Sequence, residues 1–338
     1  MSPINILKFP VSSPADTSPL NELRKAGYDP SQIMAVVRKS EGNSCVNDFS
    51  RTLSTVVWEP LIPSDAIMVF SGGTEGVLSP HVTFIVRERS STGLLAAVGR
   101  TRTLQPWEIG TTEHVREVYK TVLNMCRNLG WESDEIKLAL IKCPLLTSEK
   151  ISRAKVEGKY PATTDTYESM ALSRRASAIG IGVAVGDIET NALEQTALGR
   201  EYSSDIASCS SGAELEDTHI LLVASDHTSK AGRVRAISSQ MKDAIDAAAI
   251  LEVLSTIKEE GGQVLQVFAK CESDPSGLIR GNRHTMNGDS DIHSTRHARA
   301  AVGGLLAGLT GDTQIYVSGG AEGQGPPGGG SLCIVYEV

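Results

Sequence analysis

The chain has 338 residues, of which 40% are hydrophobic and 21% are charged, proportions typical of a globular protein with two or three domains. Aromatic residues make up only 4% and the formal net charge is -8, so neither a base-stacking platform nor a basic nucleic-acid surface is expected. No apolar stretch is as long as a membrane span, no secretory signal is recognisable, and the six scattered cysteines form no CxxC pair, which together predict a cytoplasmic protein with reduced thiols.

Three short apolar runs end in a lysine. They are IMAVVRK, ending at Lys39, IKLALIK, ending at Lys142, and VLQVFAK, ending at Lys270. Short runs rich in apolar and β-branched residues are typical of buried strands. We therefore expect each lysine to lie at the end of a strand.

A helix-compatible segment with an arginine follows each of these runs. The segments are SRTLSTVV with Arg51, ALSRRASAIGIGVAVG with Arg174, and TRHARAAVGGLLAGL, in which Arg296 and Arg299 are both candidates. Each of the three arginines is therefore expected on a helix between two strands.

A glycine-containing serine box comes next in each case. The boxes read SGGTEG from Ser71, SSGAEL from Ser210 and SGGAEG from Ser318, and each has a glutamate four residues after its serine. The apolar runs AIMVF and TQIYV precede the first and third boxes, and a further run follows every box: HVTFIVR, HILLVAS and SLCIVYE. These runs also predict strands.

The order strand–lysine, helix–arginine, serine box, strand thus occurs three times. A period of about 110 residues is too long for a solenoid repeat. The sequence predicts an α/β fold of three homologous repeat units, residues 1–102, 103–232 and 233–338, arranged around a pseudo-threefold axis. Fusion of an ancestral homotrimer into one chain would produce this arrangement.

Three such units would direct three lysines, three arginines and three serines into one cavity, because strand ends in α/β sheets commonly face the ligand. Backbone N–H groups beside glycines, serine hydroxyls and the planar fork of arginine donors suit the carbonyl oxygens of a small, flat ligand. Crowded cations lower the pKa of a lysine, and a neutral lysine can take the proton of a serine hydroxyl to form a Ser–Lys nucleophilic dyad.

The residues after the lysines favour one dyad. A glutamate stands two positions after the first and third lysines and would share a strand face with each, which would keep them protonated. These glutamates are Glu41 and Glu272. Lys142 is followed instead by Cys143 and Pro144. We therefore expect Lys142 to be the neutral lysine and Ser210 to be its partner.

Local patterns also suggest other kinds of site. His293 and His297 have the i,i+4 spacing of a zinc-binding helix, with His284 nearby, but the HExxH glutamate is missing and a polar loop is the simpler interpretation. The SGGTEG and SGGAEG boxes resemble phosphate-binding loops but lack the GK[ST] ending. The stretch AEGQGPPGGG offers carbonyls and a carboxylate suited to Mg²⁺ or Ca²⁺, or it forms a rigid uncharged loop.

Several long motifs carry a resemblance to a known family. The most specific are KSEGNSCVNDFSR, SGGTEGVLSPH, RGNRHTMNGDSDIHSTRHARAAVGGLLAGL and YVSGGAEGQGPPGGG. With these motifs, and with similarity through essentially the whole chain, the sequence resembles the cyclic amide hydrolases, which open the ring of cyanuric acid or barbituric acid. The resemblance implies three similar α/β units in a Toblerone-like fold and a homotetramer.

The resemblance also implies a site. The dyad taken as catalytic in the family matches Lys142 and Ser210, in agreement with the argument from neighbouring residues. The substrate-binding positions carry over to Arg51, Ser71, Gly72, Arg174, Ser211, Arg299, Ser318 and Gly319, with Lys39 and Lys270 in support. Arg299 is preferred to Arg296 because it lies 19 residues before Ser318, close to the 20 residues between Arg51 and Ser71.

A structural divalent cation, Mg²⁺ or Ca²⁺, near the third box is a further implication of the resemblance. The matching positions are Glu272 and the carbonyls of Ala321, Gln324, Gly325, Pro326 and Gly329. The family often has AEHQG where this chain has AEGQG, and no cofactor is expected to take part in the chemistry.

These observations together predict hydrolysis of cyanuric acid to carboxybiuret, which loses CO₂ to give biuret, through an acyl-enzyme on Ser210. Cyanuric acid has three equivalent carbonyls and matches a threefold pocket better than barbituric acid, in which a CH₂ replaces one ring N–H. Three alternatives stay open: a barbiturase that produces ureidomalonate, a non-catalytic protein that binds a cyclic imide, and a metal-dependent amidohydrolase that uses the histidines.

Overall fold

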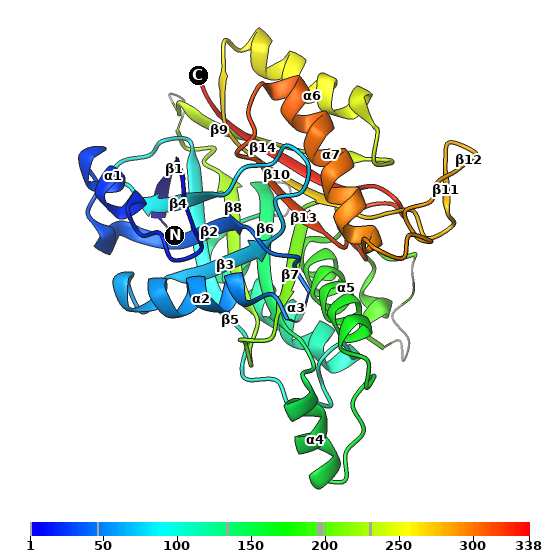
Figure 1. Ribbon diagram of the computed structural model, residues 1–338. Coiled ribbons are helices and arrows are strands. Elements are labelled where there is room, and N and C mark those ends of the chain that lie inside the picture. Colours follow the sequence, from blue (N-terminus) through cyan, green and yellow to red (C-terminus); the bar gives the residue numbers. More distant parts are fainter. Residues whose placement is uncertain (1, 46, 133–134, 195–198, 200, 230–231) are drawn as a thin grey trace.

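The chain is described by a computed structural model that covers residues 2–45, 47–132, 135–194, 199, 201–229 and 232–338. Its elements fall into three sets that follow one another along the chain, as the colours of Figure 1 show. Each set contains four main strands and at least two helices. The comparison of the three sets therefore tests the predicted repeat directly.

The first set forms one half of a large sheet. Its elements are β1 (Ser2–Pro10), α1 (Pro19–Lys25), β2 (Ile33–Ser40), α2 (Phe49–Trp58), β3 (Ile67–Gly72) and β4 (His81–Arg87). β2 pairs in parallel with β3 and antiparallel with β4, and β1 pairs antiparallel with β4. The strand order is therefore β3-β2-β4-β1.

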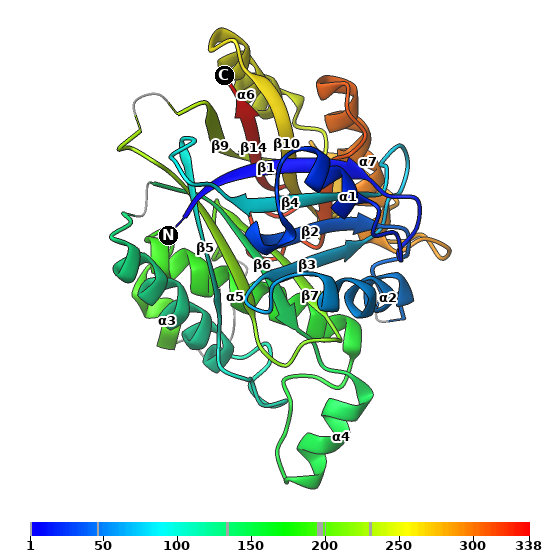
Figure 2. The ribbon, with the colours of Figure 1, turned by 90° about the vertical axis from the view of Figure 1, so that its left-hand side faces the viewer.

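The second set repeats this order as β7-β6-β8-β5. Its elements are β5 (Leu94–Arg100), α3 (Thr112–Leu129), β6 (Ile136–Pro144), α4 (Ser148–Val156), α5 (Thr166–Val185), β7 (Ala207–Gly212) and β8 (His219–Ser225). Because β1 also pairs with β5, the first two sets form a single eight-stranded sheet. α4 has no counterpart in the other sets and projects from the body of the molecule (Figures 1 and 2).

The third set has the order β13-β10-β14-β9 in a sheet of its own. Its elements are β9 (Val234–Met241), α6 (Ala247–Glu259), β10 (Gln263–Cys271), the hairpin β11 (Leu278–Ile279) and β12 (Asn282–Arg283), α7 (Ser294–Thr310), β13 (Tyr316–Gly319) and β14 (Gly330–Glu337). The same strand order in all three sets confirms the predicted α/β fold of three repeat units.

Each unit also has a first strand that we did not predict from the sequence. These strands are β1, β5 and β9; β1 and β9 mix apolar with polar residues, whereas β5 contains the apolar run Leu94–Val98, which was overlooked. β5 pairs with β8 along its whole length, so the second set of strands begins at β5. The boundaries at residues 102 and 232 stay predictions.

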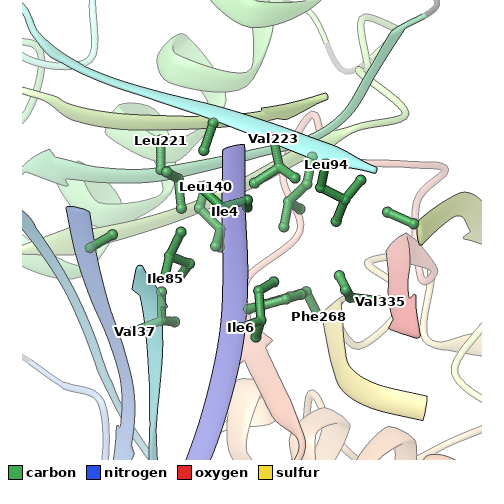
Figure 3. Packing of buried hydrophobic residues seen from close by; sticks show 14 of the residues in the cluster. Ile4, Ile6, Val37, Ile85, Leu94, Leu140, Leu221, Val223, Phe268 and Val335 are labelled. Carbon is green, nitrogen blue, oxygen red and sulfur yellow. The ribbon is translucent and has the colours of Figure 1, made fainter. Parts of the chain in front are cut away.

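A central hydrophobic cluster joins the inner faces of the strands from all three units (Figure 3). Its members include Ile4, Val37, Ile85, Leu140, Leu221, Phe268 and Val335. Successive side chains of a strand point to opposite faces. Lys39, Lys142 and Lys270 each lie two residues after a member of this cluster, so all three lysines lie on the inner face.

The helices cover the outer faces of the strands (Figures 1 and 2). α1 and α2 pack on the first unit, α3 and α5 on the second, and α6 and α7 on the third, each pair over its own apolar cluster. Within the described residues, no helix combines the length and the apolar character needed to cross a bilayer. This arrangement sends the arginines of α2, α5 and α7 toward the strand ends where the lysines lie.

Candidate active site

The lysine of each unit lies opposite the serine of the same unit in a parallel strand pair. The aligned residues are Lys39 and Ser71 in β2 and β3, Lys142 and Ser210 in β6 and β7, and Lys270 and Ser318 in β10 and β13. All six residues are buried. The structure therefore brings together each Lys–Ser pair that the repeat predicted.

Hydrogen bonding within the three pairs differs. In the first and third pairs, the lysine Nζ lies 3.2 and 3.0 Å from the serine Oγ. Lys142 donates instead to the backbone oxygens of Phe70, at 2.6 Å, and Ser211, at 3.2 Å. The Oγ of Ser210 lies 3.4 Å from the backbone oxygen of Ile141. The second pair is thus the one with no hydrogen bond between the described lysine and serine side chains.

Two of the lysines also connect neighbouring units. Lys142 of the second unit reaches Phe70 of the first, and Lys270 of the third unit donates to the backbone oxygen of Cys209 in the second, at 2.7 Å. Phe70 and Cys209 directly precede the serines of their boxes. Each of these lysines therefore ties its own serine box to that of the neighbouring unit.

A small inner cavity of about 20 Å³ is lined by the serines and arginines of all three units. Its lining comprises Ser44, Arg51, Ser71, Met170, Arg174, Ser210, Ser211, Arg299, Ser318 and Gly319. Gly72, also predicted as a binding residue, does not line the cavity; its carbonyl accepts a hydrogen bond from Lys39 Nζ at 2.8 Å. Arg299 lines the cavity, whereas the side chain of Arg296 lies outside it and is 35% exposed.

Glutamates of the serine boxes hold two of these arginines. Arg174 donates from Nε and Nη2 to the two carboxylate oxygens of Glu322, at 2.8 and 2.9 Å. Arg299 does the same to Glu75, at 2.7 and 2.6 Å. In both pairs the arginine belongs to one unit and the glutamate to the next, the third unit being followed by the first. Bidentate pairing fixes the plane of each guanidinium.

In each pair, the charge of the arginine lowers the pKa of the glutamate. Burial would raise the pKa of Glu322, but Arg174 outweighs burial and lowers this pKa to about 2. Burial would likewise raise the pKa of Glu75, and Arg299 instead holds it below its usual value. Both carboxylates are therefore ionised at neutral pH, and both arginines are held in place by a full charge.

The second glycine of the SGG boxes makes room for these arginines. A Cβ on Gly320 would lie 2.4 Å from Nη2 of Arg174, and a Cβ on Gly73 would lie 2.6 Å from Nε of Arg299. Both glycines have positive φ, 80° and 90°, which other residues rarely adopt. The SGG motif is thus explained by a close approach between the box and an arginine side chain.

The second box departs from this pattern. Arg51 donates to the backbone oxygens of Ser211, at 2.9 Å, and Cys45, at 2.7 Å. The glutamate of the second box, Glu214, does not bind this arginine; one of its carboxylate oxygens lies 3.4 Å from Nζ of Lys142. No carboxylate stands two positions after Lys142 in the sequence, but the structure brings one to this lysine from the second serine box.

The pKa shifts of the lysines follow their surroundings. Burial lowers the pKa of Lys142 to about 8, with Glu214 opposing the shift and Arg51 adding to it. Burial, assisted by Arg174, lowers the pKa of Lys270 to about 8 as well. The pKa of Lys39 falls well below its usual value through burial and the charge of Arg299.

The expected pairing of Lys39 with Glu41, two positions later, is wrong, and that of Lys270 with Glu272 stays a prediction. Glu41 is exposed and lies beyond the end of β2. Glu272 lies beyond the end of β10. The two-residue periodicity of a strand no longer applies after the strand has ended, so the argument from spacing failed for Glu41.

An outer cavity of about 660 Å³ adjoins the inner one. The two cavities share Ser44, Met170, Arg174, Arg299 and Gly319. The rings of Tyr167 and His293 stack in the outer wall, with their centroids 5.2 Å apart. The outer cavity provides the route by which a ligand can approach the serines and arginines.

The loop predicted to hold a divalent cation closes on itself. The carbonyls of Ala321, Gln324 and Pro326 each accept a backbone hydrogen bond, at 2.8, 2.8 and 2.9 Å. Glu272 accepts one from the backbone N–H of Gly328 at 3.1 Å. The described residues contain no group of three or more His, Cys, Asp or Glu side chains suited to a metal. The oxygen atoms of this loop fit a metal only in part, because several of them already accept hydrogen bonds. A Mg²⁺ or Ca²⁺ ion at this loop stays a prediction.

The three histidines considered for zinc make local contacts. His293 is the N-cap residue of α7, accepting from the backbone N–H of Thr295. His297 Nε2 lies 2.9 Å from the carboxylate of Asp289. His284 contacts the backbone oxygen of Asp274 at 3.2 Å. Each contact orders the loop before α7 or the start of that helix.

The box glutamates are the functional residues that sequence reasoning noted without assigning a role. Their constant position, four residues after each serine, was the available signal. Ser44 and Met170 also line the inner cavity, but neither belongs to a repeated motif, so nothing in the sequence distinguished them. The role of the box glutamates could not be assigned because two of them pair with an arginine of a neighbouring unit, and the order of residues does not show which units are in contact.

Comparison with known proteins agrees with this architecture. A family model described as amidohydrolase ring-opening protein matches residues 5–337. A cyanuric acid amidohydrolase from Sarocladium sp is 60% identical over 340 residues, covering 100% of this chain and 99% of the relative. One from Pseudonocardia dioxanivorans is 51% identical over 343 residues, with the same two coverages.

Solved structures extend the similarity to the fold. A structure of cyanuric acid hydrolase superposes with a TM-score of 0.92 at 38% identity and covers 100% of both chains. The cyanuric acid hydrolase from A. caulinodans gives a TM-score of 0.92 at 36% identity, covering 100% of this chain and 99% of the other. The chain therefore belongs to the amidohydrolase ring-opening family and is a hydrolase that acts on the C–N bonds of cyclic amides.

Proposed function

We propose that this protein hydrolyses cyanuric acid to carboxybiuret, with Ser210 as the nucleophile and Lys142 as the base. The observation that carries the proposal is the inner cavity, where each of three units contributes a serine and an arginine to one small space. Cyanuric acid is a flat ring with three equivalent carbonyls, so each carbonyl can meet a similar set of donors. The relatives at 60% and 51% identity, which are named cyanuric acid amidohydrolase, also support this substrate.

In the first half of the proposed reaction, the neutral Nζ of Lys142 takes the proton of Ser210 as Oγ attacks a ring carbonyl carbon. The carbonyl oxygen becomes an oxyanion, which arginine and backbone N–H donors stabilise. The ring C–N bond then breaks, and the ammonium of Lys142 returns its proton to the leaving nitrogen. The result is an open chain attached to Ser210 as an acyl-enzyme.

Water completes the reaction. Lys142, neutral again, takes a proton from a water molecule whose oxygen attacks the acyl carbon. The bond from that carbon to Oγ breaks, and Ser210 regains its proton from the lysine ammonium. One water molecule is consumed, carboxybiuret leaves, and its carbamic acid group loses CO₂ to give biuret.

The depressed pKa of Lys142 is compatible with its role as the base, although the pKa values of Lys39 and Lys270 are depressed as well. A lysine with a pKa of about 8 has a substantial neutral fraction near neutral pH, unlike an exposed lysine. In the proposal, the first and third Lys–Ser pairs bind and polarise the two other carbonyls. Because Lys142 Nζ now donates to Phe70 and Ser211, it must turn toward Ser210 when the substrate binds.

Substrate binding must also widen the inner cavity. Its volume of about 20 Å³ is close to the ~10–15 Å³ that one water molecule needs, which is too small for a six-membered ring. Met170 and Arg174 belong to both cavities and stand at the junction between them. Outward movement of the Met170 side chain would admit the ring from the outer cavity, while Arg174 stays paired with Glu322.

The test of this function is a comparison of two rings. Purified protein is incubated with cyanuric acid or with barbituric acid, the loss of each ring is followed by ultraviolet absorbance, and the products are identified by mass spectrometry. We expect cyanuric acid to disappear and biuret to accumulate. Consumption of barbituric acid alone would show that the substrate is wrong. If neither ring is consumed but one binds in calorimetry, the site is a binding site rather than a catalytic one.

A further inference from the structure

We propose that Glu214 is a positioning residue of the reaction centre, which holds Lys142 and stabilises the lysine ammonium that forms when Ser210 loses its proton. This inference rests on the proposed function and adds a third member to the Ser–Lys dyad. The starting observation is that one of three equivalent glutamates has a different partner from the other two.

The position of Glu214 breaks an otherwise regular pattern. By analogy with the other boxes, Glu214 would bind Arg51 of the preceding unit. Its carboxylate instead lies 3.4 Å from Nζ of Lys142, and Nε of Arg51, which has no hydrogen-bond partner among the described residues, lies 3.9 Å from Oδ2 of the buried Asp48. A Cβ on Gly212 would lie 2.3 Å from the carboxylate of Glu214, whereas the corresponding glycines of the other boxes face arginines.

This placement gives one of the three lysines a carboxylate of its own. The side chains of Lys142 and Glu214 are 1% and 16% exposed, so the pair is shielded from most of the solvent. Proton transfer from Ser210 creates a positive charge on Nζ within this poorly solvated site. A carboxylate at 3.4 Å stabilises that charge as it develops, and the fixed pairing also limits the orientations open to the lysine.

The charged and titratable groups that face Lys142 act in opposite directions. Glu214 favours the ammonium form, the guanidinium of Arg51 disfavours it, and the buried thiol of Cys143 lies next to the lysine in sequence. Burial dominates and lowers the pKa of Lys142 to about 8. Burial would raise the pKa of Glu214, but Lys142 and Arg51 outweigh it and keep this carboxyl ionised.

Removal of the carboxylate charge should therefore have two separable effects. With Glu214→Gln, the pKa of Lys142 should fall further, so the low-pH limb of the kcat/KM profile should move to lower pH by about one unit or more. The rate on the high-pH plateau should nevertheless fall by about tenfold or more, because the developing ammonium has lost its counter-charge. A residue with only a structural role would lower the plateau without moving the limb.

Glu322→Gln is the matched control, because it makes the same chemical change at the equivalent position of the third box. It is expected to raise KM, since Glu322 holds Arg174, and to leave the low-pH limb in place. Glu214→Asp keeps the charge on a shorter side chain and should restore the limb to its wild-type position, with a plateau rate between those of the wild type and Glu214→Gln. Thermal unfolding of each variant verifies that the compared proteins are folded.

The outcomes separate this inference from the proposed function. If the wild type does not consume cyanuric acid, the proposed function fails and this inference fails with it. If the wild type is active but Glu214→Gln leaves the limb unmoved, the role of Glu214 is wrong while the function stands. Because the charge of Glu322 raises the pKa of Lys270, a shift of the limb in Glu322→Gln instead would assign the base to Lys270 and overturn both the dyad and the role of Glu214.

Discussion

Arg174 of the second unit and Glu322 of the third form a buried bidentate pair, with Nε–Oε2 and Nη2–Oε1 distances of 2.8 and 2.9 Å. The pair joins α5 to the loop after β13, and it also fixes one of the arginines that line the inner cavity. The same interaction therefore holds two units together and shapes the site. The loss of one partner would leave the other as an unpaired buried charge.

Glu322→Gln should lower stability in a pH-dependent way. The pKa of Glu322 is about 2 in the folded protein against 4.5 for an unperturbed glutamate, so the unfolded chain takes up this proton first as the pH falls. The stabilisation is fully present above about pH 5 and is lost between pH 4.5 and 2, and it amounts to roughly 3 kcal/mol. Urea unfolding of wild type and variant should differ most at pH 7 and least near pH 3. A difference that stays constant over this range would contradict the linkage.

Gly320→Ala should disturb both stability and substrate binding. The new Cβ would lie 2.4 Å from Nη2 of Arg174 and would require a residue other than glycine at a φ of 80°. We expect a loss of about 1–3 kcal/mol of unfolding free energy and a higher KM. Gly304→Ala is the control, because Gly304 lies within α7 and a Cβ there meets nothing within 4 Å. Equal effects of the two substitutions would exclude a specific contact between the box and the arginine.

Substitution of the three serines should affect kcat and KM differently. Ser210→Ala should lower kcat by about 10³-fold or more, because it removes the proposed nucleophile. Ser71→Ala and Ser318→Ala should retain most of kcat and mainly raise KM, since their hydroxyls are proposed to bind the two other carbonyls. Steady-state kinetics of the three variants decides the assignment. Wild-type turnover in Ser210→Ala together with an inactive Ser71→Ala would transfer the chemistry to the first unit.

Arg299 and Arg296 contact the same carboxylate but should differ in importance. Arg299 is buried and binds Glu75 through two hydrogen bonds, whereas Arg296 is 35% exposed and contacts it once, at 3.3 Å. Arg299→Gln should raise KM by about 100-fold, since it breaks a buried pair at the inner cavity. Arg296→Gln should change KM by less than about fivefold, because Arg296 is partly exposed and makes a single contact with Glu75. Similar KM values for the two variants would place Arg296 in the site as well.

The repeated order of residues made much of the fold predictable. An apolar run ending in lysine, a helix with an arginine and a serine box recur three times, and each of these elements is present in the structure. Because side chains alternate along a strand, each lysine lies on the same face as the member of the central cluster two residues before it. The first strands β1 and β9 were missed because polar residues interrupt their apolar pattern, whereas the apolar run of β5 lies outside the repeated motif and was overlooked.

The sequence by itself determined which chemical groups meet at the inner cavity, because three copies of one motif fold in the same way and place equivalent residues at equivalent strand ends. Only the tertiary structure decided which charges pair. Glu41 is two residues from Lys39 but exposed, whereas Glu214 reaches Lys142 from the loop after β7. Spacing along a strand predicts neighbours only while the strand continues. Beyond its end, the path of each loop and the packing between units determine which carboxylate lies beside which cation.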